Sequence, residues 1–242
     1  MKPIRRQHPG AASIATALDA GESIRLLMVR EGRLSPAARD VLARCKAADV
    51  SIRKAGQREM KRMSAAGEQP ELLALVGPDP NATLEEVLAT GGAVWLLTGV
   101  AYPGNAGFAI RTAEVSGAAG IVLDASFDRE GRRQALRASM RADRLFPVLW
   151  ASADEVLELA RDTGYRLVGI EDQGKQAPWE TDLSGPTVFV VGGEAGGVAS
   201  SLLERCDTTI RIPMTGFIQS YNLQAALAIV AGERLRQGLL EP

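Results

Sequence analysis

The amino-acid sequence predicts an α/β protein in which most of the chain forms a parallel sheet flanked by helices. From residue 93 onward, short and almost continuously apolar runs alternate with helical segments. Continuous apolar runs are typical of strands buried on both faces, and strand–helix alternation is typical of a parallel sheet. The predicted strands are residues 94–97, 120–123, 146–150, 166–170, 187–191 and 209–212. The predicted helices are residues 105–117, 131–142, 152–163, 198–205 and 220–237.

Residues 1–78 are predicted to form a separate small α/β domain. Ser35 is a good N-cap residue and Pro36 suits the first helical position, which predicts a helix over 36–47. Turn-forming residues at 77–82 then interrupt the pattern, and a capping box formed by Thr83 and Glu86 predicts a short helix. We therefore expect a linker at 79–92 and a second domain at 93–242. The other predicted elements of the small domain are helices 12–20 and 57–63 and strands 23–29, 50–54 and 71–76.

The composition excludes several classes of protein. Hydrophobic residues make up 46% of the chain, but no apolar run reaches the roughly 18–20 residues that a bilayer span requires. The N-terminus has no signal-peptide core, so we expect a soluble cytoplasmic protein without a membrane partner. His8 is the single histidine, which excludes a His-rich metal site, and no metal is expected. Cys45 and Cys206 lie far apart in the sequence and are predicted to be free thiols.

Two stretches are strongly basic although the net charge of the chain is −1. Residues 53–62 carry five cationic side chains against one acid, and residues 129–144 carry six arginines against two acids. A solvated helix face would explain either stretch alone, but two of them favour contact with phosphates. The predicted RNA-contacting residues are Arg53, Lys54, Arg58, Arg132, Arg133 and Arg137.

Three polar, glycine-containing segments end predicted strands, where ligands of parallel sheets bind. In the first, Asn105 can cap a helix that carries Arg111, although a capped helix with a surface arginine would also explain the pattern. In the third, Ser220 and Asn222 stand at the start of a long Ala- and Leu-rich helix, and capping requires only one of them.

The second segment, residues 190–198, is a glycine-rich turn between a predicted strand and a predicted helix. Its glycines do not follow the Gly-x-Gly-x-x-Gly pattern of dinucleotide sites, and a carboxylate at Glu194 would repel a pyrophosphate. A nucleotide-dependent oxidoreductase is therefore disfavoured. A glycine turn that admits a ligand edge to the backbone, with Glu194 as a hydrogen-bond acceptor, fits better.

Together the three segments resemble the motifs of the SpoU/TrmH-type RNA 2′-O-ribose methyltransferases of the SPOUT superfamily. The patterns are Asn-x-Gly-x-x-x-Arg-Thr-Ala at 105–113, Gly-x-Glu-x-x-Gly at 192–197 and Ile-Pro-Met-x-Gly-x-x-x-Ser-x-Asn at 212–222. The resemblance implies that the C-terminal segment of the chain threads a loop to form a deep trefoil knot, and it implies S-adenosyl-L-methionine (AdoMet) as cofactor and a homodimer. It also implies that the N-terminal domain binds the RNA substrate.

The resemblance further implies roles for individual residues. The cofactor pocket is expected to include Gly192, Ile212, Met214 and Tyr221, with Tyr221 standing where family members usually have leucine. The catalytic residues are expected to be Arg111, Asn105, Glu194, Ser220 and Asn222.

A guanidinium stays charged at any working pH, so we expect Arg111 to clamp a phosphate and stabilise the developing oxyanion instead of acting as a base. Asn105 and Asn222 would position the nucleotide and the arginine, Ser220 would hydrogen-bond near the ribose, and Glu194 would anchor the arginine or a loop.

Three targets or activities stay open within this interpretation. The accessory N-terminal domain favours ribosomal RNA as the substrate, with transfer RNA as the alternative. A non-catalytic RNA-binding relative is a second alternative, which the presence of all five catalytic candidates disfavours.

Overall fold

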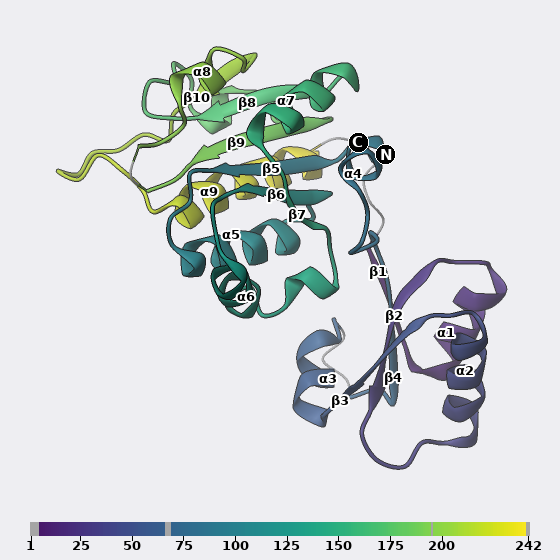
Figure 1. Cartoon of the computed structure of the whole chain (residues 1–242). Coiled ribbons are helices and arrows are strands. Elements are labelled where there is room, and N and C mark those ends of the chain that lie inside the picture. The colour runs from purple at the N-terminus through teal and green to yellow at the C-terminus, as the bar shows by residue number, and fades with distance from the viewer. Residues whose placement is uncertain (1–4, 66–68, 195, 241–242) are drawn as a thin grey trace. The chain divides into compact units, whose positions relative to one another are not determined.

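The computed structural model describes residues 5–65, 69–194 and 196–240 (Figure 1). The chain divides into two compact units, one ending at Asp79 and the other beginning at Pro80. Within the described residues, no helix combines the length and the apolarity that crossing a membrane requires.

The N-terminal unit is built on a mixed four-stranded sheet in the order β1-β4-β2-β3. Strands β2 and β3 are parallel, whereas β4 runs antiparallel to both β1 and β2. Ser35 caps the second helix as predicted, since its hydroxyl accepts from the backbone N–H of Ala38 at 3.2 Å. The strands are β1 (Arg6–Pro9), β2 (Ile24–Arg30), β3 (Ser51–Ala55) and β4 (Leu72–Val76), and the helices are α1 (Gly10–Asp19), α2 (Pro36–Ala47) and α3 (Gln57–Met63).

The C-terminal unit contains the predicted parallel sheet, with six strands in the order β10-β8-β9-β5-β6-β7. All five strand pairs are parallel. The strands are β5 (Ala93–Thr98), β6 (Gly120–Asp124), β7 (Val148–Trp150), β8 (Arg166–Ile170), β9 (Thr187–Gly192) and β10 (Thr208–Ile210). The α-helices are α4 (Leu84–Ala89), α5 (Pro103–Val115), α6 (Arg129–Ala138), α7 (Ala153–Asp162), α8 (Ser200–Leu203) and α9 (Leu223–Leu240).

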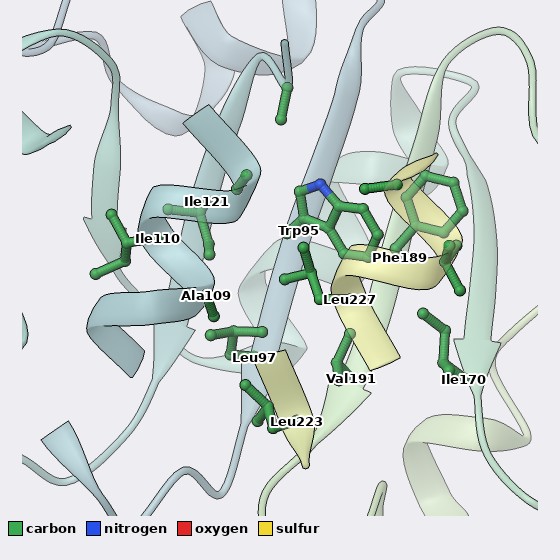
Figure 2. Packing of buried hydrophobic residues seen from close by; sticks show 14 of the residues in the cluster. Trp95, Leu97, Ala109, Ile110, Ile121, Ile170, Phe189, Val191, Leu223 and Leu227 are labelled. Atoms are coloured by element: carbon green, nitrogen blue, oxygen red, sulfur yellow. The ribbon is translucent and has the colours of Figure 1, made fainter. Parts of the chain in front are cut away.

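Both faces of the six-stranded sheet are buried, because successive side chains of its central strands enter different cores. Trp95 and Leu97 of β5 pack under α5, α6 and α9, whereas Val94 and Leu96 pack under α4 and α7 (Figure 1). Figure 2 shows the first of these cores, in which Trp95 stacks on Phe189 with ring centroids 4.7 Å apart. This two-sided burial is the physical reason for the continuous apolar runs.

Helix α4 falls within the segment that was predicted to be a linker. Thr83 and Glu86 form the expected capping box, with bonds of 2.8 and 3.3 Å. However, Leu84, Val87 and Leu88 are buried in the core under α7, so the helix belongs to the C-terminal unit. The unit therefore begins some residues before the position that strand periodicity suggested.

The chain after β10 passes very close to the loop after β8. The backbone N–H of Arg211 donates to the carbonyl of Gln176 at 2.9 Å, and Ile210 bridges to Gln176 in parallel. A Cβ atom on Gly174 would lie 2.4 Å from the carbonyl carbon of Ile210, so only glycine fits there. The same segment stays irregular from 211 to 222, and α9 begins at Leu223, later than predicted.

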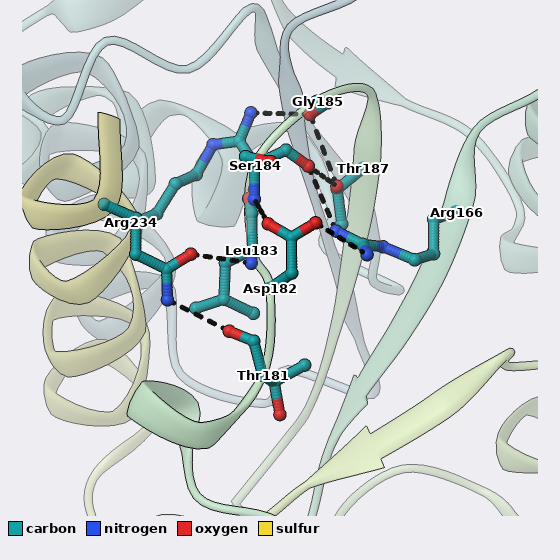
Figure 3. A network of polar contacts seen from close by, with 9 residues as sticks. Arg166, Thr181, Asp182, Leu183, Ser184, Gly185, Thr187 and Arg234 are labelled. Atoms are coloured by element: carbon teal, nitrogen blue, oxygen red, sulfur yellow. Dashed lines mark hydrogen bonds and ion pairs between the residues drawn. The ribbon is translucent and has the colours of Figure 1, made fainter. Parts of the chain in front are cut away.

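A polar network holds α9 against the loop that leads into β9 (Figure 3). The guanidinium of Arg234 donates to the carbonyls of Leu183 and Gly185, the latter at 2.7 Å. Gln237 donates to the carbonyl of Thr181 at 3.0 Å and accepts from the N–H of Leu183 at 2.8 Å. These bonds fix the last turns of α9 at the edge of the sheet opposite to the carboxyl edge.

Candidate active site

A cavity of about 530 Å³ lies at the carboxyl ends of β8 and β9, beside the segment that follows β10. Its walls come from the three regions that parallel-sheet geometry brings to one edge. The lining residues are Ile170 to Gln173, Val191 to Glu194, Gly196, Gly197, Ile212, Met214, Gln219 to Leu223, and Ala226.

All four residues predicted to bind the cofactor line this cavity. Gly192 ends β9, and Ile212 and Met214 lie on the irregular segment before α9. Tyr221 also lines the cavity, with 46% of its surface exposed. Ser220 and Asn222, which were predicted to be catalytic, line it as well.

The glycine turn after β9 folds tightly back on itself. Gly193 and Gly197 form an antiparallel bridge, and the N–H of Gly197 donates to the carbonyl of Gly193 at 3.2 Å. A Cβ on Gly192 would lie 2.0 Å from the carbonyl carbon of Gly197, and one on Gly193 would lie 1.9 Å from the carbonyl oxygen of Gly99. Gly192 and Gly193 therefore allow other parts of the chain to pass close to the turn, and both also line the cavity where a ligand edge was expected. Ala195 of this motif lies outside the described residues.

Glu194 joins the second motif to the first. Its carboxylate accepts from the side-chain amide of Asn105 at 2.6 Å and from the backbone N–H of Ala101 at 3.0 Å. Partial burial raises the pKa of Glu194, but these hydrogen bonds outweigh burial and hold the pKa below its ordinary value. Glu194 is thus an ionised acceptor that ties the glycine turn to the start of α5. Of the two roles considered from the sequence, the contacts of its carboxylate support the anchoring of a loop.

Asn222 brings the third motif to the same place. Its side-chain amide donates to the side-chain oxygen of Asn105 at 3.4 Å, and its own oxygen accepts from the N–H of Gln224 at 3.0 Å. Asn105 therefore stands between Glu194 and Asn222, which are far from it in the sequence. Three segments that were recognised separately meet through one chain of hydrogen bonds.

Arg111 lies on α5, further along the helix than Asn105, and its side chain is exposed. It does not line the cavity, and within the described part of the chain it makes no hydrogen bond or ion pair. An exposed guanidinium without an internal partner is available to an external anion.

The sequence did not single out Glu171, Asp172, Gln173 and Gln219, which all line the cavity. Three of them directly follow β8, so the rule that ligands bind beyond the carboxyl ends of strands could have found them. The lining residues include the acids Glu171, Asp172 and Glu194 and, among the described residues, no lysine or arginine. Such a cavity suits a ligand with net positive charge and fits the size of a nucleoside-containing cofactor.

Some of the predicted RNA-contacting residues form ion pairs within the described part of the protein, whereas others do not. Lys54 and Arg58 are exposed and make no ion pair with a described residue, whereas Arg53 pairs with Glu59. On α6, Arg133 and Arg137 share Glu130 at 3.3 and 2.9 Å. The guanidinium of Arg132 lies 4.6 Å from the ring centroid of Trp150.

The parallel sheet, the cavity at its carboxyl edge and the convergence of three motifs define a cofactor-binding α/β protein with a polar site beside the cavity. Residues 93–232 match the model of the SpoU rRNA methylase family, and the chain belongs to that family.

Relatives with known names agree with this assignment. The chain is 29% identical to a 23S rRNA (adenosine(1067)-2′-O)-methyltransferase from Streptomyces laurentii, over 84% of this chain and 76% of that protein. It is 27% identical to the 23S rRNA (guanosine-2′-O-)-methyltransferase RlmB of Pseudomonas putida, over 88% and 89% of the two chains.

Among solved structures, the SpoU methyltransferase AviRb from Streptomyces viridochromogenes in complex with AdoMet has the same fold. Its TM-score is 0.59 at 23% identity, and the match covers 100% of this chain and 92% of that one.

Proposed function

We propose that this protein transfers a methyl group from AdoMet to a ribose 2′-hydroxyl of RNA, with ribosomal RNA as the substrate. The observation that carries the proposal is the hydrogen-bonded chain of Glu194, Asn105 and Asn222 beside the cavity. Family membership and the names of the relatives support the reaction class, and both relatives act on 23S rRNA by name.

The residues around the cavity suit this reaction. When bound, AdoMet would supply a methyl carbon, activated by its bond to the sulfonium, for in-line attack by the ribose 2′-oxygen. Alignment of the two reactants can account for about 7–11 kcal/mol of barrier lowering in favourable cases. The glycine turn and Ile212, Met214 and Tyr221 would hold the cofactor, because they form the walls of the cavity.

Catalytic roles follow from position and charge. Asn105 and Asn222 hold each other in place and would orient the target nucleotide, with Ser220 hydrogen-bonding near its ribose. Arg111 has no internal partner among the described residues, so it would clamp the adjacent phosphate and stabilise charge on the 2′-oxygen. The proton of the hydroxyl would leave to solvent or the RNA, since a guanidinium cannot accept it.

We propose a homodimer and a knotted C-terminal segment as parts of the same assignment. Phe217 and Ile218 lie on the irregular segment before α9 and are 107% and 80% exposed. Exposed large apolar side chains of this kind are typical of an interface. Arg111 does not line the cavity of its own chain. In a dimer, RNA bound between the two copies would bring Arg111 and the cavity together. The close passage of Ile210 and Arg211 along the loop after β8 supports threading of the chain there.

The N-terminal unit would bind the RNA substrate through Lys54 and Arg58, and the protein would act where ribosomes are assembled, in the cytoplasm. Mapping of 2′-O-methyl sites in RNA from cells with and without the gene tests the substrate. We expect one site in ribosomal RNA to lose its methyl group. Loss of a transfer-RNA site would establish the tRNA alternative, and no change in any RNA would favour a non-catalytic RNA-binding protein.

A further inference from the structure

Glu171 is a cavity residue that none of the three motifs contains. It directly follows β8, and its backbone N–H donates to the carbonyl of Ile210 at 3.0 Å. Its carboxylate accepts from the backbone N–H of Val198, directly after the glycine turn. Glu171 therefore contacts the segment after β10 through its backbone and the glycine turn through its side chain.

The side chain of Glu171 packs closely against the backbone of the glycine turn. A Cβ on Gly197 would lie 2.1 Å from Oε1 of Glu171, and Gly197 has a φ of +63°, which other residues rarely adopt. The carboxylate is thus packed against the turn at a defined place in the cavity wall.

No cationic side chain of the described residues pairs with Glu171. Within the described residues, its second oxygen accepts only from the N–H of Asp172 at 3.3 Å. The cavity lining adds Asp172 and Glu194 and, among the described residues, contributes no cationic side chain. The described residues of the lining thus carry acidic side chains without a cationic counterpart, an arrangement that favours a bound cation.

The proposed reaction changes the charge of the molecule in this cavity. AdoMet carries a sulfonium, an ammonium and a carboxylate, for a net charge of about +1 at neutral pH. During transfer the S–CH₃ bond breaks and its electron pair stays on sulfur, the O–CH₃ bond forms, and the hydroxyl proton leaves. The product S-adenosyl-L-homocysteine (AdoHcy) has a neutral thioether and a net charge of about zero.

We propose that Glu171 makes the cavity select cationic AdoMet over neutral AdoHcy, so that product leaves after transfer. This inference depends on the proposed function, since it assumes that AdoMet binds in the cavity. A ligand held in a cavity of about 530 Å³ lies within about one Debye length, roughly 8 Å, of the carboxylates in its wall. The interaction is therefore only partly screened by salt.

Calorimetric titration with AdoMet and with AdoHcy tests the inference. Glu171→Gln keeps an oxygen that can accept from Val198 but removes the charge. We expect it to weaken AdoMet binding about tenfold while AdoHcy binding changes less than about twofold. Glu171→Ala also removes the acceptor and should weaken both ligands, AdoMet more strongly. Glu158→Gln removes one exposed charge on α7, a helix that contributes no residue to the lining, and as the matched control it should change neither affinity.

A measurement on the unaltered protein keeps the test valid if a variant fails to fold. Raising the salt concentration from about 0.05 M to about 0.5 M should weaken AdoMet binding more than AdoHcy binding. Equal weakening of the two ligands, in Glu171→Gln and with salt, would overturn the selection by charge. If the unaltered protein bound neither ligand, the proposed function would fail, and this inference with it.

Discussion

At the scale of single residues, Asn105 of the first motif joins the three segments of the site. It donates to Glu194 and accepts from Asn222, so one side chain links the glycine turn, α5 and the start of α9. A helix cap was the simplest sequence-based explanation, yet the side chain makes no capping bond.

Replacing Asn105 with alanine should change the titration of Glu194. The pKa of Glu194 lies below its ordinary value of 4.5, so its contribution to stability is present above that pH and is lost as the pH falls through the lowered value. Asn105→Ala removes a donor to the carboxylate, and the pKa should rise. Titration of the Glu194 carboxyl carbon by NMR measures this directly, and an unchanged pKa would show that the bond contributes nothing in solution.

At the scale of elements, the glycine turn is shaped by close approach of the backbone to itself. Gly193→Ala would force a Cβ to within 1.9 Å of the Gly99 carbonyl oxygen, whereas nothing lies within 4 Å of a Cβ on Gly196. We expect Gly193→Ala to destabilise the protein by about 1–3 kcal/mol and to weaken AdoMet binding. Urea unfolding and calorimetry measure both effects. Gly196→Ala is the control for stability, and equal destabilisation of the two variants would contradict the structure.

The network on α9 offers a second comparison between neighbouring residues. Arg234 donates to two carbonyls of the loop before β9. Arg236 is exposed and, among the described residues, its only ion pair is with Glu233 one turn away. Arg234→Ala should cost about 1.5–3 kcal/mol, because it leaves loop carbonyls without their charged donor. Arg236→Ala should cost less than about 1 kcal/mol. Thermal and urea unfolding of the two variants should therefore separate them clearly.

Most elements could be predicted from the sequence because their periodicity has a local cause. Two-sided burial produces the apolar runs of β5 and β9, and the Ser35 and Thr83 caps mark their helices. Strand β1 was missed, because the sequence Arg-Gln-His-Pro is polar and the strand is held at a sheet edge by its pairing with β4. Whether α4 belongs to the linker or to the C-terminal unit depends on the core in which Leu84 and Leu88 are buried. The local sequence does not contain that information.

The sequence predicted only those site residues that belong to one of the three motifs. Gly192, Ile212, Met214 and Tyr221 were expected at the cavity and line it. Glu171 was missed, because its importance arises from the approach of the turn at Val198, which is distant in the sequence. The need for glycine at 192 and 193 likewise comes from close packing within the chain and could not be distinguished from ligand access beforehand.

At the scale of the whole molecule, the near-neutral charge conceals local positive surfaces. Lys54 and Arg58 are the predicted RNA-binding residues of the N-terminal unit that make no ion pair with a described residue. Glutamate at both positions should weaken RNA binding. It should also reduce the slope of the logarithm of the binding constant against the logarithm of the salt concentration, by roughly one unit for each phosphate that the variant no longer neutralises. AdoMet affinity should not change. Arg39→Glu, at an exposed arginine on α2, is the control, and an equal effect there would indicate nonspecific attraction.

The central claim is that one chain binds AdoMet in its glycine-lined cavity and uses Arg111, outside that cavity, on the RNA. The most direct measurement is a methyl-transfer assay and an AdoMet titration on the same Arg111→Ala preparation. We predict that AdoMet affinity stays within about twofold while transfer falls by about a hundredfold or more. Near-normal transfer by the Arg111→Ala protein would contradict the account.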